Sequence, residues 1–257
     1  MGVLTAVLIV SYHAIASPAS AVAVPPDRFE RDLHALRDAG YAFVSLDRCA
    51  DWLAGACALS DRTAVITFDD GYASVAIAGL PVLQRLDAPA TVFVIGGRLG
   101  GDNRWPGQAA RIPSMPLVDA GALRELVHAG VAVGSHSRSH AVLTRLSTEA
   151  LRAEMIDSAD RLEQLLQVPV RHFAYPYGER GSREVALARA RYVTAVSAES
   201  RLVTPYANPH DLPRLDAHDL HVARRLRLLG PALLGPYLAA RRSARQLRRA
   251  SARGLGR

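Results

Sequence analysis

The stretch "VITFDDGYAS" (residues 65–74) joins an apolar, β-branched run directly to two adjacent carboxylates and a glycine. A simple turn does not require two acids at this point. Short apolar runs of this kind alternate with amphipathic stretches along the chain, which is typical of a parallel sheet or barrel with helical crossovers. The expected strands are residues 6–13, 41–46, 63–70, 90–96, 131–137, 172–178 and 192–198. Seven strands joined by helices predict a (β/α) barrel.

Length and composition support one large domain with a separate tail. A chain of 257 residues with 49% hydrophobic content can bury the core of a single α/β domain. The net charge of +7 is unevenly distributed, because residues 222–257 hold ten arginines and no acid, whereas residues 1–221 hold 21 arginines and 24 acids. We therefore expect a barrel domain over residues 1–221 and an Arg-rich tail over residues 222–257.

The tail also bears on the partners of the protein. Its basic residues are confined to one end and aromatic residues do not interleave with them, so a nucleic-acid partner is disfavoured. Arginine clusters on both sides of the apolar segment 228–240 instead predict contact with an anionic membrane surface, with a solvated basic tail as the alternative.

Cysteines and the N-terminal run give an expectation about the compartment. In a helix, Cys49 and Cys57 would lie about 12 Å apart, beyond the roughly 7 Å that a disulfide tolerates, which favours a reducing compartment. The run "GVLTAVLIV" (2–10) lacks a basic leading region and is too short to span a bilayer. We interpret it as part of a strand, although "SPASA" (17–21) also resembles a signal-peptide cleavage site. The expected location is the cytoplasm or the inner membrane face, and secretion is disfavoured.

Polar clusters occur where predicted strands end, namely Asp69 and Asp70, His136 and His140, and "YPYG" at 175–178. In a parallel barrel these ends share one face, where active sites are built. Two histidines four residues apart can bind one metal if the backbone between them turns helically, and an Asp adds the third ligand of a hydrolytic site. Each motif alone is as often a pair of turn histidines or an Asx turn, but their joint occurrence after strands favours a metal site. One acid would then bind the metal while its neighbour accepts a proton.

These motifs resemble the polysaccharide deacetylases of carbohydrate esterase family four. "TFDDG" (67–71), "HSRSH" (136–140) and "FAYPYG" (173–178) are similar to the first three motifs of the family, and the resemblance extends over residues 6–220. It implies a distorted (β/α)7 barrel in a single α/β domain and a divalent metal that is commonly zinc. The implied reaction is hydrolysis of N-acetyl groups from an N-acetylhexosamine-containing glycan or glycolipid of the cell envelope. Related cyclic-amide and ureide hydrolases, and a glycan-binding pseudo-enzyme, are the alternatives.

The resemblance also implies roles for single residues. Asp69 corresponds to the general base, and Asp70, His136 and His140 correspond to the metal ligands. The backbone N–H of Tyr177 would help to hold the oxyanion. Many relatives carry an arginine in the third motif that orients the base, but Ala174 stands there in this chain. Arg171 and Arg214 are both candidates for that task, and the sequence does not choose between them.

A second departure concerns the general acid. The histidine that ends the C-terminal strand of relatives is absent here, where "LPRLDAHDLHV" (212–222) offers only His218 and His221 in a polar context. The strand at 6–13 ends in His13 and resembles the start of relatives whose motif order is circularly permuted. Because the first and last strands of a closed barrel are neighbours, we predict that His13 reaches the same mouth and acts as the general acid. A histidine bonded only to backbone is the alternative.

The Gly- and Pro-rich segment 96–116 is too long for a routine connection and carries Arg104 and Trp105 near its centre. Such loops are often lids or binding rims. Tyr72, Trp105 and Tyr175 are candidates for stacking on a sugar ring, with simple packing as the alternative.

Overall fold

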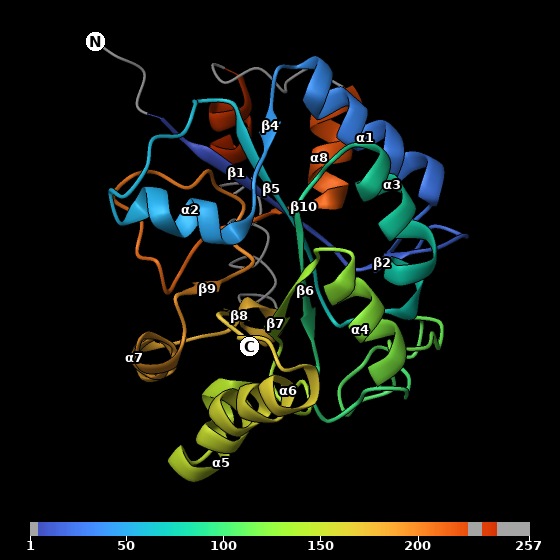
Figure 1. The fold of residues 1–257 in the computed structure, drawn as a ribbon, viewed down its shortest axis with the longest axis vertical. Coiled ribbons are helices and arrows are strands. Elements are labelled where there is room, and N and C mark those ends of the chain that lie inside the picture. The colour runs from blue at the N-terminus through green and yellow to red at the C-terminus, as the bar shows by residue number, and fades with distance from the viewer. Residues whose placement is uncertain (1–4, 226–232, 241–257) are drawn as a thin grey trace, which may run out of the picture.

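The computed structural model describes residues 5–225 and 233–240. Its centre is an eight-stranded parallel sheet with the order β10-β1-β5-β6-β7-β8-β9, in which β4 also pairs with β5 (Figure 1). The strands of this sheet are β1 (Val7–Tyr12), β4 (Ala42–Phe43), β5 (Thr63–Phe68), β6 (Ala90–Val94), β7 (Ala132–Ser135), β8 (His172–Ala174), β9 (Thr194–Val196) and β10 (Leu215–Asp216). All seven predicted strands are present, and β10 is an additional one. Two short strands, β2 (Ala14–Ile15) and β3 (Ala23–Val24), form a separate pair.

Helices cover the outside of the curled sheet (Figure 1). The α-helices are α1 (Pro26–Asp38), α2 (Leu46–Leu53), α3 (Leu80–Arg85), α4 (Ala120–His128), α5 (Thr148–Arg152), α6 (Ser158–Leu166), α7 (Ser182–Arg191) and α8 (Ala217–Arg225). Short π-helical segments are η1 (Val75–Gly79) and η3 (Ala153–Asp157), and short 3-10 helices are η2 (Leu143–Arg145) and η4 (Pro176–Gly178). Proline at the start of α1 suits the first helical turn, and the apolar stripe of Phe29, Leu33 and Leu36 is buried as its spacing predicts.

The sheet is curled, so its concave face encloses a second apolar cluster separate from the core beneath the helices. Alternate residues of β1 show this, since Leu8 and Val10 belong to the core beneath the helices whereas Val7 and Ile9 belong to a second apolar cluster. That second cluster also contains residues of β5, β6, β8 and β9. Side chains of a strand alternate between its two faces, so this inner cluster is the interior of a barrel. The distorted (β/α) barrel expected for a single α/β domain is thereby confirmed.

Irregular chain fills the space between β9 and β10. Ser197 donates its backbone N–H to the carbonyl of Leu212 at 2.7 Å, and Leu212 donates in turn to Ala195 at 2.9 Å. Farther along, Val203 forms an antiparallel bridge with Val7 of β1. The segment 197–212 therefore joins the last strands of the sheet to the first.

Part of the predicted apolar tail packs on the body of the protein. Residues 233–240 form a helix whose Leu234 and Leu238 are buried in the main core. Two leucines of this apolar stretch are therefore withdrawn from any membrane surface, whereas Leu233 stays 52% exposed. Residues 226–232 and 241–257, which hold most of the tail arginines, lie outside the described residues. In the described ranges, no helix combines the length and apolarity needed to cross a bilayer.

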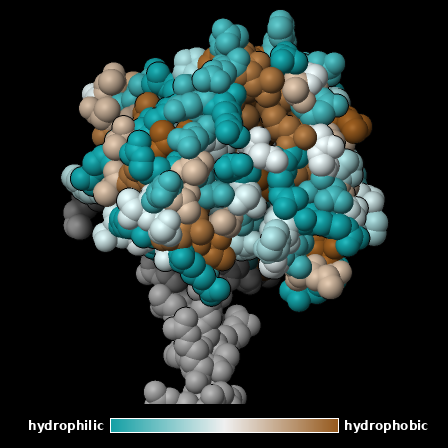
Figure 2. All heavy atoms as spheres, turned by 90° about the horizontal axis from the view of Figure 1, so that it is seen from below, coloured by the Kyte–Doolittle hydropathy of each residue, from teal (hydrophilic) through white to brown (hydrophobic). Residues whose placement is uncertain are grey.

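Apolar residues on one face of the surface occur in several small groups separated by hydrophilic residues (Figure 2).

Candidate functional site

The two adjacent carboxylates follow β5, where the backbone turns sharply. Asp69 extends the pairing of β5 with β1, since its N–H donates to the Tyr12 carbonyl at 2.9 Å. Asp70 and Gly71 then adopt φ values of 69° and 72°. A side chain at position 71 would also bring its Cβ to 2.9 Å from Val94. The glycine of "TFDDG" is thus required both by the left-handed backbone and by close packing.

The two histidines lie on the loop that follows β7. Ser137 and His140 have positive φ values, so the backbone between the histidines does not turn helically, and an irregular loop brings the two side chains together instead. Glu154 holds this loop from η3, because its carboxylate accepts from the backbone N–H groups of Arg138 and Ser139, each at 2.9 Å. No motif in the sequence indicates this role of Glu154.

Asp70, His136 and His140 form a cluster in which one potential ligand atom of each lies within 4.8 Å of the others. Oδ1 of Asp70 lies 3.3 Å from Nε2 of His136 and 3.4 Å from Nε2 of His140. Two metal bonds of about 2.0–2.1 Å at a tetrahedral angle separate two ligand atoms by about 3.3 Å. Asp70 Oδ1 is buried without a hydrogen-bond partner among the described residues, which is costly unless a cation is bound. The three side chains therefore fit one small divalent metal ion.

The surroundings of the histidines prepare Nε2 as the ligand atom. Nδ1 of His136 lies 2.8 Å from the carbonyl of Ala174, so that nitrogen carries the proton and Nε2 faces Asp70. Burial, together with the neighbouring His136, lowers the pKa of His140 to about 3, which leaves this imidazole neutral at physiological pH. Burial opposes protonation of His136, but the close contact with the Asp70 carboxylate and the charge of Asp69 outweigh this and raise the pKa of His136.

Asp69 is held by a different partner from Asp70. Arg214 donates from Nη1 and Nη2 to the two carboxylate oxygens of Asp69, both at 2.7 Å, and the pair is buried. Burial alone would raise the pKa of Asp69, but the charges of Arg214 and His136 outweigh it and hold that pKa well below its usual range. Arg171 instead pairs with Asp47 on the surface. Of the two candidate arginines, Arg214 is thus the one that contacts the predicted base.

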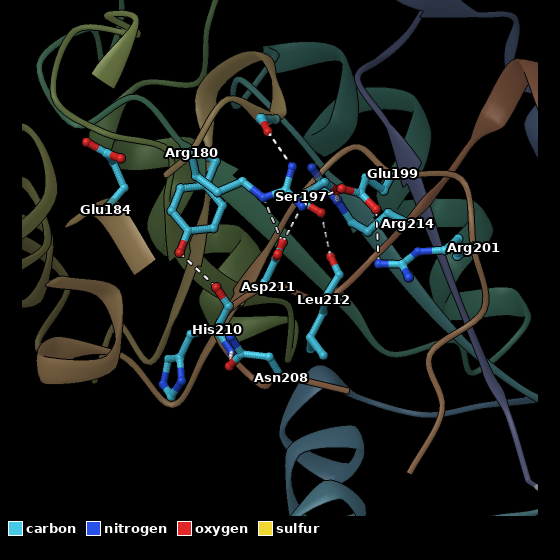
Figure 3. A network of polar contacts seen from close by, with 12 residues as sticks. Arg180, Glu184, Ser197, Glu199, Arg201, Asn208, His210, Asp211, Leu212 and Arg214 are labelled. Atoms are coloured by element: carbon cyan, nitrogen blue, oxygen red, sulfur yellow. Dashed lines mark hydrogen bonds and ion pairs between the residues drawn. The ribbon is translucent and has the colours of Figure 1, made fainter. Parts of the chain in front are cut away.

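Arg214 belongs to a polar network that reaches the third motif (Figure 3). Its Nε donates to the carbonyl of Ser197 at 2.9 Å. Near it, Arg180 donates to Asp211 at 2.7 Å, to Glu199 at 2.8 Å and to the carbonyl of Gly178 at 3.0 Å. Sequence reasoning missed Arg180, whose only signal is its place two residues after "YPYG".

The turn that Arg180 holds is strained. Tyr177 has φ 60°, which is uncommon for a residue with a side chain. Gly178 follows with φ 67°, and a Cβ there would lie 2.7 Å from the Cβ of Ala198. The "YPYG" turn therefore needs its glycine, and the hydrogen bond from Arg180 to the Gly178 carbonyl fastens it further.

The Asp70–His136–His140 cluster, the Asp69–Arg214 pair and the "YPYG" turn border one cavity of about 490 Å³. Its lining includes all six residues expected in the site, which are His13, Asp69, Asp70, His136, His140 and Tyr177. His13 follows β1 on the face that carries Ile9 and Ser11, as the alternation of strand side chains requires. His218 is instead on α8, where its Nε2 lies 3.3 Å from the Ala21 carbonyl.

The three candidate stacking aromatics do not offer open faces. Tyr72 and Tyr175 are each 1% exposed and Trp105 is 5% exposed. Trp105 packs against His140 with ring centroids 4.5 Å apart. For Tyr72 and Tyr175 the packing interpretation is therefore the correct one.

A buried two-histidine, one-carboxylate centre beside an ionised carboxylate at the mouth of a (β/α) barrel defines the class of metal-dependent hydrolases. The sequence profile of the polysaccharide deacetylase family matches residues 58–196, which is more than half of the chain. The chain belongs to this family, whose name denotes hydrolysis of carbon–nitrogen bonds other than peptide bonds.

Two curated relatives and two solved structures illustrate the similarity. YxkH of Bacillus subtilis (strain 168) is 26% identical over 192 residues, which are 74% of this chain and 64% of that protein. The poly-β-1,6-N-acetyl-D-glucosamine N-deacetylase of Staphylococcus aureus (strain MRSA252) is 24% identical over 164 residues, 60% of this chain and 54% of that protein. The chain thus spans less than two thirds of the length of either relative.

Structural similarity supports the same fold. The Streptococcus pyogenes deacetylase PplD, in complex with acetate, superposes with a TM-score of 0.73 at 24% identity, covering 85% of this chain and 97% of that one. IcaB from Ammonifex degensii superposes with a TM-score of 0.72 at 23% identity, covering 86% and 97%.

Proposed function

We propose that the protein removes N-acetyl groups from N-acetylhexosamine residues of a glycan or glycolipid. The observation that carries the proposal is the buried Asp70–His136–His140 cluster with the ionised Asp69 beside it in one cavity. Family membership supports the reaction class, and the name of the S. aureus relative supports an N-acetylglucosamine polymer as substrate. Zinc is the metal we expect, because a site of two imidazoles and one carboxylate suits it.

Each side chain then has a separate task. Asp70, His136 and His140 would hold a divalent cation, which would supply Lewis-acid chemistry toward the acyl carbonyl and water. Asp69 takes the proton of the attacking water, and Arg214 holds its carboxylate ionised and in place. The backbone N–H of Tyr177 donates to the developing oxyanion from the strained turn. His13 donates a proton to the departing amine from another part of the cavity wall.

The decisive experiment combines acetate release with metal analysis. Wild-type protein is incubated with N-acetylated oligosaccharides and lipid-linked sugars, and acetate is quantified. The D69N variant should keep the metal stoichiometry of the wild type and lose most activity, whereas H136A should lose both metal and activity. Comparable metal loss in D69N and H136A would overturn the division of roles between the two aspartates.

Two other outcomes would replace the proposed reaction. Hydrolysis of a small cyclic amide without acetate release from any sugar would assign the protein to the cyclic-amide hydrolases. Metal binding with no turnover of either substrate class would identify a glycan-binding pseudo-enzyme.

Contact with the inner membrane face stays a prediction. With Leu234 and Leu238 packed in the core, it depends more on the charge of the tail arginines than on apolar burial.

A further inference from the structure

The histidine loop, residues 136–140, joins two of the candidate metal ligands. Nδ1 of His136 lies 2.8 Å from the Ala174 carbonyl, but Nδ1 of His140 is buried and has no hydrogen-bond partner in the described part of the chain. Ser137 and His140 also have φ values of 67° and 63°, which are uncommon for residues with a side chain. The position of the His140 imidazole therefore depends on the rings packed around it and on the bonds that hold this loop.

Backbone N–H groups of the segment after β6 hold the carbonyls of the histidine loop. Gly96 donates to the Ser137 carbonyl at 3.0 Å, and Gly97 donates to the Arg138 carbonyl at 2.8 Å. A Cβ at position 97 would lie 2.5 Å from the same oxygen of Arg138, so this close approach requires a glycine. These bonds leave the N–H groups of the loop to be held from elsewhere.

The carboxylate of Glu154 holds those N–H groups. Its Oε2 accepts from the N–H groups of Arg138 and Ser139, each at 2.9 Å, and its Oε1 accepts from the Ser139 hydroxyl at 2.6 Å. Glu154 lies on the π-helical segment η3, next to Met155, which is buried in the main core. Hydrogen bonds to an ionised carboxylate are roughly twice as strong as neutral ones. One side chain from a fixed part of the fold thus binds the loop at three points between the two histidines.

We propose that Glu154 is a positioning residue for the metal centre, which holds the histidine loop in its metal-binding conformation and thereby sets the affinity for the cation. This inference rests on the metal-dependent function proposed above. Both oxygens of Glu154 are occupied by the loop, so its effect on the cation is exerted through the ligands. The effect falls mainly on His140, because His136 has the Ala174 carbonyl as a second anchor.

The test measures zinc binding to metal-free protein, without any turnover. The Kd for zinc is determined by competition with a chromophoric chelator. E154A removes all three acceptor contacts and should raise the Kd about 10- to 100-fold, the range typical for residues that support a metal ligand. E154Q keeps one oxygen that can accept from the two N–H groups but loses the charge, so it should raise the Kd less, about threefold.

Glu163 on α6 provides a matched control, because its carboxylate also holds a backbone N–H of a neighbouring loop. Its Oε1 accepts from the Val170 N–H at 2.8 Å, and its Oε2 pairs with Arg191 at 2.9 Å. None of these three residues lines the cavity that contains the candidate metal ligands. E163A should therefore lower the urea midpoint of the metal-free protein, as E154A does, but leave the Kd for zinc unchanged.

The comparison of the two glutamates decides the role of Glu154. If E154A and E163A have the same Kd for zinc, Glu154 contributes only to stability and the positioning role is wrong. If E154A does not fold, E154Q is compared with E163Q in the same way, and equal Kd values again overturn the proposal.

Acetate release from N-acetylated sugars, measured in parallel, separates this role from the reaction. If the wild type releases acetate while E154A keeps the zinc Kd of the wild type, the role of Glu154 is wrong and the proposed function stands. If the wild type deacetylates no sugar but E154A binds zinc more weakly than E163A, the positioning role is supported without the reaction.

Discussion

Replacing Arg214 by methionine removes the cation that faces Asp69 and leaves a buried carboxylate without its partner. The side chains of the pair are only 2% and 8% exposed, and both hydrogen bonds measure 2.7 Å. Removing one member of such a buried pair costs about 3–5 kcal/mol of folding free energy. Arg171 provides the matched control, because its pair with Asp47 is about half exposed and contributes about 0–1 kcal/mol. Urea denaturation of R214M and R171M should resolve this difference.

The same substitution should alter the pH dependence of catalysis. In the wild type the pKa of Asp69 lies below its usual value of 3.8, so the ion pair stabilises the fold fully above about pH 4 and loses its effect only in stronger acid. Without Arg214, burial favours the protonated acid, so the acid limb of kcat/KM should move to higher pH. Activity lost at neutral pH should then return in part at alkaline pH.

Lysine at position 214 separates charge from geometry. R214K keeps a cation beside Asp69 but loses the bidentate fork, so its acid limb should stay close to that of the wild type while kcat falls. This variant also keeps the test informative if R214M does not fold. The reasoning is refuted if R171M is as unstable as R214M, or if R214M retains the acid limb of the wild type.

Three further predictions address other groups. H13A should lower kcat on an acetylated sugar about a hundredfold or more, because general acid catalysis typically contributes that much to the rate. Turnover of an acetate ester with a good leaving group should fall far less. Equal losses on both substrates at constant metal content would exclude His13 as the acid and direct attention to His218. R180M should lower kcat about tenfold with little change in KM, because a misaligned Tyr177 N–H stabilises the oxyanion less well. R183M, on the neighbouring α7, is the control and should leave kcat near that of the wild type. Equal kcat values for the two variants would contradict this role of Arg180. Deleting residues 241–257 should release the protein from anionic vesicles without changing turnover of a soluble substrate, and unchanged vesicle binding would exclude the tail as a membrane contact.

The sequence predicted the strands well because a parallel sheet buried on both faces requires continuous apolar runs. β1 and β5, for instance, are buried at every position. It missed β10, a two-residue strand that contains Asp216 and has no apolar run. The site motifs could be predicted because each follows a strand, whereas the residues that hold these motifs in place could not. Only the folded structure shows that Arg171 pairs with Asp47 and Arg214 with Asp69, because Arg214 lies 145 positions from Asp69 along the chain.

The backbone at the end of β5 explains how two adjacent acids can serve one cavity. Along a strand, successive side chains point to opposite faces, so a continued strand would direct Asp69 inward and Asp70 outward. Val65 and Thr67 establish the inward face, since Val65 lies in the inner cluster and Thr67 Oγ1 is 3.1 Å from Arg214 Nη1. Asp69 continues that face and meets Arg214. Asp70 leaves the strand through φ 69°, a conformation that aspartate tolerates better than most residues, and its carboxylate thereby reaches the imidazoles. The different tasks of the two acids thus follow from one left-handed residue at the strand end.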